Sequence, residues 1–131
     1  MDRARGTVLT NAERMVLITA IREHAVSVRF EPQARRLQAM GLLDVVAPGV
    51  NPGTHRVVFP SHAGRCMALA YVAQSWCDLW AELGLRLQTR AAYSSTTKDT
   101  LRCLRRAREA NRRAMAAAVR CWGYYQEAGR A

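Results

Sequence analysis

The 131-residue chain holds 20 lysine and arginine residues against 10 aspartate and glutamate residues, a formal net charge of +10 at pH 7. Half of its residues are apolar, enough for one domain or for a small domain with a helical extension. No run approaches the roughly 18–20 apolar residues that cross a bilayer, and no uninterrupted apolar stretch follows the N-terminus as in a secretory signal. We therefore expect no membrane partner and a cytoplasmic location.

The first forty residues predict two helices separated by a short extended segment. Residues 1–9 predict a basic, flexible tail. Thr10 with Glu13 three residues later predicts a capping box, which starts a helix that runs to about His24. Residues 25–30 alternate apolar and polar positions, which indicates a short strand or an extended turn. Pro32 suits the first turn of a second helix, and Gly41 follows its end at Met40.

A β-hairpin is predicted next. Residues 42–46 and 55–59 are mostly apolar, and residues 47–54 between them contain two prolines and two glycines. Such a turn-rich segment between two strands predicts a hairpin with a loose tip.

Two long helices are predicted in the second half of the chain, over residues 65–83 and 98–122. Apolar residues at three- and four-residue steps indicate the first of them, and we expect Gly84 to interrupt or end it. Thr96 with Asp99 predicts the start of the second helix. Trp122 and Gly123 predict its end.

Small residues form a stripe along the last predicted helix, at spacings of four, three, four, three and four. This rhythm places all of them on one helical face. A seam of small side chains lets another helix approach closely, either from a second copy of the chain or from residues 65–83 of the same chain. The helix-pairing candidates are Cys103, Ala107, Ala110, Ala114, Ala117 and Cys121.

Arginines surround this stripe. From Leu85 onward the chain has eleven basic residues and three acidic ones. This excess of positive charge favours a polyanionic partner, and nucleic acid is the commonest polyanion. An acidic protein surface is the alternative. The candidates for phosphate or partner contacts are Arg102, Arg105, Arg106, Arg108, Arg112 and Arg113.

Two segments carry a family resemblance. Residues 35–43 contain the end of a short helix, where a leucine, a glycine and a further apolar pair lead into the hairpin. Residues 59–65 leave the second strand through a small turn, and a Gly-Arg pair then begins the next helix. In this order around a hairpin, the segments resemble the winged helix-turn-helix DNA-binding regulators, over about residues 10–70. One departure is that two helices rather than three precede the wing.

The resemblance implies a mainly α fold with a small β-hairpin wing (α+β). A winged-helix-like unit over residues 10–64 would be followed by a helical extension over residues 65–131, which serves packing, dimerisation or partner binding. The helix at residues 32–40 would lie in the major groove of DNA, with Ala34, Leu37 and Met40 facing the core. Arginine suits guanine and glutamine suits adenine. The implied DNA-binding candidates are Gln33, Arg35, Arg36, Gln38, Asn51, Thr54, His55 and Arg56.

The sequence contains no recognisable arrangement of catalytic residues. The three histidines fall in different predicted elements, the acidic residues form no close pair, and the four cysteines lack the spacing of a metal site. We expect no enzyme activity, no cofactor and no metal. The leading hypothesis is a winged-helix transcription regulator, a homodimer that binds double-stranded DNA, in a bacterial or phage-infected cell or on its nucleoid. The alternatives are a protein-binding adaptor or inhibitor, such as one encoded by a phage, that uses the same scaffold against an acidic protein, and a non-specific nucleic-acid-binding accessory protein.

Overall fold

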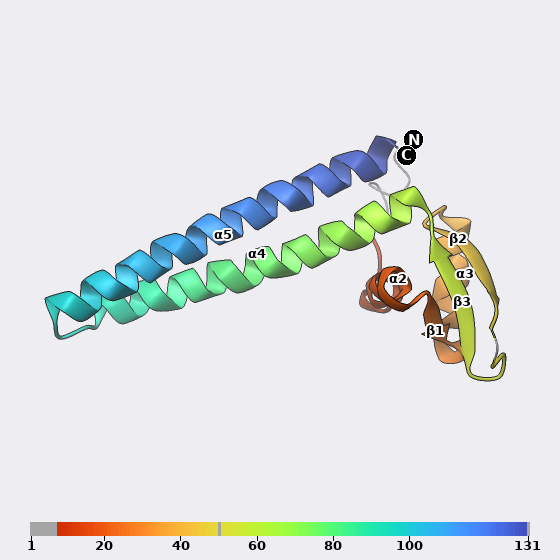
Figure 1. The fold of residues 1–131 in the computed structure, drawn as a ribbon, viewed down its shortest axis with the longest axis horizontal. Coiled ribbons are helices and arrows are strands. Elements are labelled where there is room, and N and C mark those ends of the chain that lie inside the picture. Colours follow the sequence, from red (N-terminus) through yellow and green to blue (C-terminus); the bar gives the residue numbers. More distant parts are fainter. Residues whose placement is uncertain (1–7, 50, 131) are drawn as a thin grey trace. The chain divides into compact units, whose positions relative to one another are not determined.

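The computed structural model describes residues 8–49 and 51–130, so most of the expected N-terminal tail lies outside the described residues. The fold is mainly α with a small antiparallel sheet, which confirms the expected fold class (Figure 1). The chain forms two compact units. One comprises the residues up to Val72 together with those from Trp122, and the other comprises Ala73–Cys121. No described helix is long and apolar enough to cross a membrane.

Helix α2 (Asn11–Glu23) begins with the predicted capping box. The Thr10 hydroxyl accepts a hydrogen bond from the Glu13 backbone N–H at 3.2 Å, and the Glu13 carboxylate accepts one from the Thr10 N–H at 2.8 Å. These two bonds satisfy backbone donors that the first helical turn leaves without partners. The helix ends at His24, which adopts the left-handed conformation with φ 56°.

The segment after α2 contains one strand and one helical turn. Strand β1 (Ala25–Ser27) fits the expected extended segment, but the next three residues form a 3₁₀ helix, η1 (Val28–Phe30). The Ser27 hydroxyl starts this turn by accepting a bond from the Arg29 N–H at 3.4 Å. Helix α3 (Glu31–Ala39) follows at once and begins and ends one residue earlier than expected.

The sheet has three strands in the order β1-β3-β2. Strands β2 (Leu43–Pro48) and β3 (His55–Pro60) form the predicted hairpin. The pairing extends two residues further along β2 than expected, because Ala47 and Pro48 continue the ladder opposite β3. An edge strand tolerates this proline, since its missing N–H is not needed by a neighbour. On its other edge β3 pairs with β1, a pairing that the sequence did not predict.

The core of the first unit lies between α2, α3 and the sheet. Its fully buried side chains include Leu17, Leu37 and Val58. Tyr71 of helix α4 (His62–Ala92) and Ala128 of helix α5 (Thr97–Arg130) belong to the same core. The observed division of the chain therefore differs from the expected boundary at residues 64 and 65, because the first turns of α4 and the end of α5 pack into the first unit.

Helix α4 (His62–Ala92) runs through Gly84 without a break, so the expected interruption there is wrong. Glycine lowers helix stability but does not prevent a helix. Here the missing side chain leaves room for a residue of α5. A Cβ atom at Gly84 would lie 2.2 Å from the Asn111 side-chain oxygen of α5. The close approach of the two helices therefore explains this residue.

Helix α5 (Thr97–Arg130) begins as expected. The Thr96 hydroxyl accepts a hydrogen bond from the Asp99 N–H at 3.1 Å. The predicted end near Trp122 and Gly123 is wrong, because the helix continues to Arg130. Its last turns pack within the first unit, where the Tyr125 and Tyr71 rings meet edge to face with centroids 6.2 Å apart.

Candidate nucleic-acid interface

Helix α3 presents one buried and one exposed face. Ala34 and Leu37 are fully buried, which leaves Arg35 and Arg36 exposed on the other side of the helix. Gln33 is half-buried, and its side-chain oxygen has no hydrogen-bond partner within the described chain. The helix therefore offers a short basic surface, as the expected recognition helix would.

Arg35 links α3 to the hairpin. Its guanidinium donates to the Gln38 side chain and to the Val46 carbonyl, both at 3.3 Å, and lies 3.5 Å from the Glu31 carboxylate. Gln38 in turn donates to the Asp44 carbonyl at 3.4 Å. These bonds hold Arg35 and Gln38 beside strand β2, while about half of the Arg35 side chain stays exposed.

Arg36 is paired with a buried carboxylate. Its Nε lies 2.9 Å from Glu13, whose side chain is only 2% exposed. The same carboxylate closes the capping box of α2, so this ion pair joins the two helices. Burying a carboxylate without a cation costs several kcal/mol, of order 3–5 when one partner is removed. Arg36 therefore has a structural role even though its own side chain is largely exposed.

Arg56 of strand β3 pairs with Glu31 at the start of α3. The two side chains meet at 2.9 Å, and Arg56 is only 17% exposed. The hydrogen bond from Arg56, supported by the nearby charges of Arg56 and Arg35, lowers the pKa of Glu31 despite some desolvation. Glu31 thus neutralises part of the positive charge that the sequence assigns to this surface.

The remaining wing candidates bond mainly to one another. The Thr54 hydroxyl and N–H both donate to the Asn51 carbonyl, at 3.2 and 3.0 Å. His55 Nδ1 lies 3.0 Å from the Thr54 hydroxyl. These bonds shape the turn between β2 and β3, and all three side chains are exposed there.

The stripe of small residues on α5 is buried against α4 of the same chain. All six members are at most 8% exposed, and Ala117 is fully buried. The Cys121 thiol donates to the Gln74 side chain at 3.5 Å, and the Arg113 guanidinium lies 4.8 Å above the Trp80 ring. Helix pairing within the chain therefore accounts for this stripe, and a second copy is not required to cover it.

The arginines of α5 fall into two groups. Arg112 and Arg113 both pair with Glu109, the latter at 3.0 Å. The hydrogen bond from Arg113, with further contributions from Arg112, lowers the pKa of the Glu109 carboxyl. Arg130 pairs with Glu127 at 3.5 Å. Five others have no acidic partner among residues 8–49 and 51–130. These are Arg102, Arg105, Arg106, Arg108 and Arg120.

Part of this second group surrounds a shallow hollow of about 310 Å³ on α5. Lys98, Arg102, Arg105 and Arg106 line it together with Leu101. The four cationic side chains lie within about two helical turns and face the same open space. The arrangement suits an anion with several oxygens, such as the phosphates of a nucleic-acid backbone.

The cysteines are free thiols. Cys66, Cys103 and Cys121 are buried, and burial raises the pKa of the Cys66 and Cys121 thiols. In the described part of the chain, no three histidine, cysteine or acidic side chains gather as a metal site would need.

The sequence analysis did not predict the ion pairs of two acidic residues. Glu13 pairs with Arg36, and Glu31 pairs with Arg35 and Arg56. The Glu31–Arg35 pair has the four-residue spacing of a helical ion pair, which is a readable signal. The other two pairs join residues more than twenty positions apart and have no local signature.

Comparisons with protein-family models, with curated proteins and with solved structures gave no match for this chain.

Proposed function

We propose that the chain is a DNA-binding transcription regulator of winged-helix type. Residues 10–72 would read duplex DNA through α3 and the β2–β3 hairpin, and the basic helix α5 would add phosphate contacts. The element order supports this proposal. The turn η1 supplies a third helical element before the hairpin, and so fills the one departure from the winged-helix pattern seen in the sequence.

The observation that carries the proposal is the placement of Arg35. This residue is half exposed on α3 and is held against β2 by its bond to the Val46 carbonyl. An arginine fixed beside strand β2, on the exposed face of a short helix, is suited to bidentate bonds with guanine in the major groove. Gln38, held by the same strand, would contact a neighbouring base.

The residues that we propose to read bases are Arg35 and Gln38. Arg36 and Arg56 each lie 2.9 Å from a glutamate, Glu13 and Glu31, which is closer than the 3.5 Å between Arg35 and Glu31. They would therefore position α3 more than they would read sequence. Residues 8–72 contain seven arginines against four acidic residues, whereas residues 73–121 contain ten basic residues against four acidic ones. Much of the electrostatic affinity for DNA would therefore come from the second unit.

The test is selection of bound DNA from a random duplex pool at about 150 mM salt, where purely electrostatic binding is suppressed. We expect one enriched sequence, with twofold symmetry if the regulator is a dimer. Arg35→Gln should weaken binding to that sequence about tenfold, the value of one good bidentate contact. Arg86→Gln is the matched control, because Arg86 is an exposed arginine paired with Glu82 on α4.

Absence of enrichment, with binding that disappears as salt rises, would contradict a sequence-specific regulator. A second candidate function, an adaptor that binds an acidic protein, would then lead. Several large apolar side chains of the second unit favour it, because they are exposed on the same two helices as the arginines. They include Trp76, Leu79, Leu101, Leu104, Met115 and Val119. Capture of one protein partner without specific DNA affinity would support it.

A further inference from the structure

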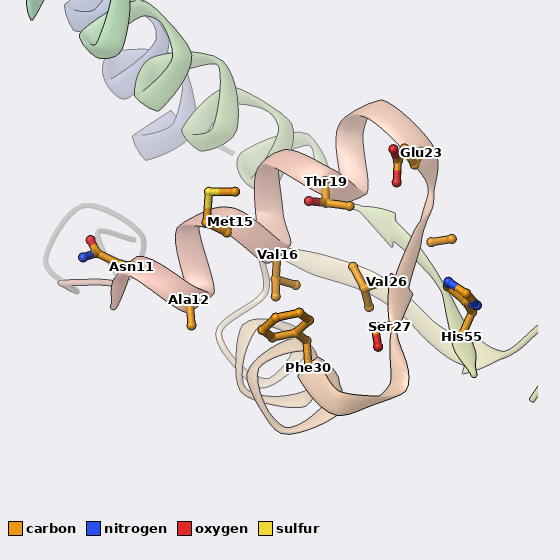
Figure 2. Close-up of a pocket in the computed structure, with 11 residues that line it drawn as sticks. Asn11, Ala12, Met15, Val16, Thr19, Glu23, Val26, Ser27, Phe30 and His55 are labelled. Atoms are coloured by element: carbon orange, nitrogen blue, oxygen red, sulfur yellow. The ribbon is translucent and has the colours of Figure 1, made fainter. Parts of the chain in front are cut away.

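A cavity of about 370 Å³ lies in the first unit, between α2 and the segment formed by β1 and η1 (Figure 2). The Val16 side chain and the Phe30 ring point toward one another across it, and Val26 stands beside them (Figure 2). The Met15 side chain, 61% exposed, lies at its mouth. Its volume and apolar lining are those of a site for a small molecule.

The two titratable side chains of the cavity lie toward one end. Glu23 and His55 lie at the end opposite Asn11 and Ala12 (Figure 2). Glu23 is exposed and has no ion pair or hydrogen bond with another side chain among residues 8–49 and 51–130. Other glutamates behave differently, since each has an arginine partner within 4 Å. These are Glu13, Glu31, Glu82, Glu109 and Glu127.

We infer that this cavity binds a small amphiphilic cation, which consists of an ammonium group attached to a hydrocarbon chain. The hydrocarbon lies against Val16, Val26 and Phe30, where each buried methylene strengthens binding by up to about fourfold. The ammonium group lies at Glu23 and gives that carboxylate a partner. An anion of the same shape meets a like charge at this position, and a neutral molecule leaves the carboxylate unpaired.

The cavity is connected to α3 through Phe30. This residue lines the cavity and is also the N-cap residue of α3. A bound cation contacts Phe30 and so acts on the start of the helix that would enter the DNA groove. This regulatory consequence rests on the proposed function, and thermodynamic linkage then requires that DNA and the cation change each other's affinity by the same factor.

The test is titration calorimetry on the full chain without DNA, with n-octylammonium, octanoate and octan-1-ol as probes. We expect saturable 1:1 binding that is tightest for octylammonium and weaker for hexylammonium. Glu23→Gln should weaken octylammonium binding about threefold to fivefold, as for a partly exposed ion pair, and leave octanol binding unchanged. Asp44→Asn is the matched control. Asp44 is an exposed carboxylate of β2 outside the cavity, and it has no ion pair in the described chain.

Three results would overturn the site. They are the absence of saturable octylammonium binding, equal binding of octylammonium and octanoate, and an unchanged octylammonium affinity in Glu23→Gln. None of them involves DNA, so none bears on the proposed function. The regulatory consequence is tested separately on the selected DNA sequence. A change in DNA affinity of more than about twofold at saturating octylammonium supports it, and an unchanged affinity overturns that part alone.

Discussion

At the scale of single residues, buried or shared carboxylates organise the arginines of the first unit. Glu13 is almost completely buried and serves both the cap of α2 and the ion pair with Arg36. Glu31 joins α3 to β3 through Arg56 and also pairs with Arg35. Neighbouring arginines of α3 therefore have different roles, and substitutions can separate them.

Arg36→Ala should lower the free energy of unfolding by about 2 kcal/mol, since it leaves Glu13 buried without its cation. This value lies below the range for fully buried pairs because Arg36 itself is largely exposed. Arg35→Ala is the control, with an expected change of less than about 1 kcal/mol. Urea unfolding of both variants measures the difference. If both variants lowered the free energy of unfolding by the same amount, a special role of the Arg36–Glu13 pair would be contradicted.

The Glu31–Arg56 pair predicts a loss of stability in acid. Because the folded state lowers the pKa of Glu31, the pair stabilises the fold fully above the ordinary glutamate pKa of about 4.5, and this contribution is lost as the pH falls through the lower folded value. Glu31→Gln should therefore flatten the pH dependence of stability below about pH 4.5. Denaturant unfolding between pH 6 and pH 3 measures this. Parallel curves for the two proteins would contradict it.

At the scale of elements, the close approach of helices to their neighbours decides which glycines and alanines can change. A Cβ atom at Gly64, in the first turn of α4, would lie 1.8 Å from the Leu42 carbonyl oxygen. At Gly123 of α5 nothing lies within 4 Å of such an atom. Both residues are helical, so the same substitution should have opposite effects at the two positions.

Gly64→Ala should destabilise the protein by about 2–3 kcal/mol, because backbone atoms must move to make room. Gly123→Ala should stabilise it by about 0.5–1 kcal/mol through higher helix propensity. Thermal unfolding of the two variants measures both effects. A stable Gly64→Ala protein would contradict the close approach of the start of α4 to Leu42.

The stripe on α5 gives a similar pair of variants. Ala110→Leu should cost about 1–3 kcal/mol, since Ala110 is 1% exposed in the seam with α4. Ala116→Leu, at an exposed position of the same helix, should change stability by less than about 0.5 kcal/mol. Circular dichroism during heating compares them. Tolerance of leucine at Ala110 would indicate a loose helix pair.

At the scale of the whole molecule, the two units differ in how their positive charges are balanced. The first unit balances many of its arginines internally, whereas the hollow lined by Lys98, Arg102, Arg105 and Arg106 has no acidic residue in its lining. If the proposed function holds, the first unit supplies sequence preference. The second then supplies an attraction that depends on salt but not on sequence.

The combined variant Arg102→Gln, Arg105→Gln and Arg106→Gln should weaken binding to all duplexes by similar factors. It should also reduce the slope of log affinity against log salt by up to about 3, close to one for each phosphate that the protein no longer neutralises. Binding isotherms at several salt concentrations measure the slope. Arg86→Gln combined with Arg112→Gln is the control, because both residues are paired with glutamates. An unchanged slope would contradict phosphate binding by this cluster.

Features that depend on neighbours along the chain could be read from the sequence. The caps at Thr10 and Thr96, the hairpin and the buried stripe of α5 are of this kind, because hydrogen bonds three residues apart and helical periodicity are local. Other features required the folded chain: β1 pairs with β3, α4 passes Gly84 unbroken, Arg36 meets Glu13, and a cavity forms between α2 and η1. Each of these depends on packing between distant segments, whose energy outweighs the local preference of a glycine or a turn.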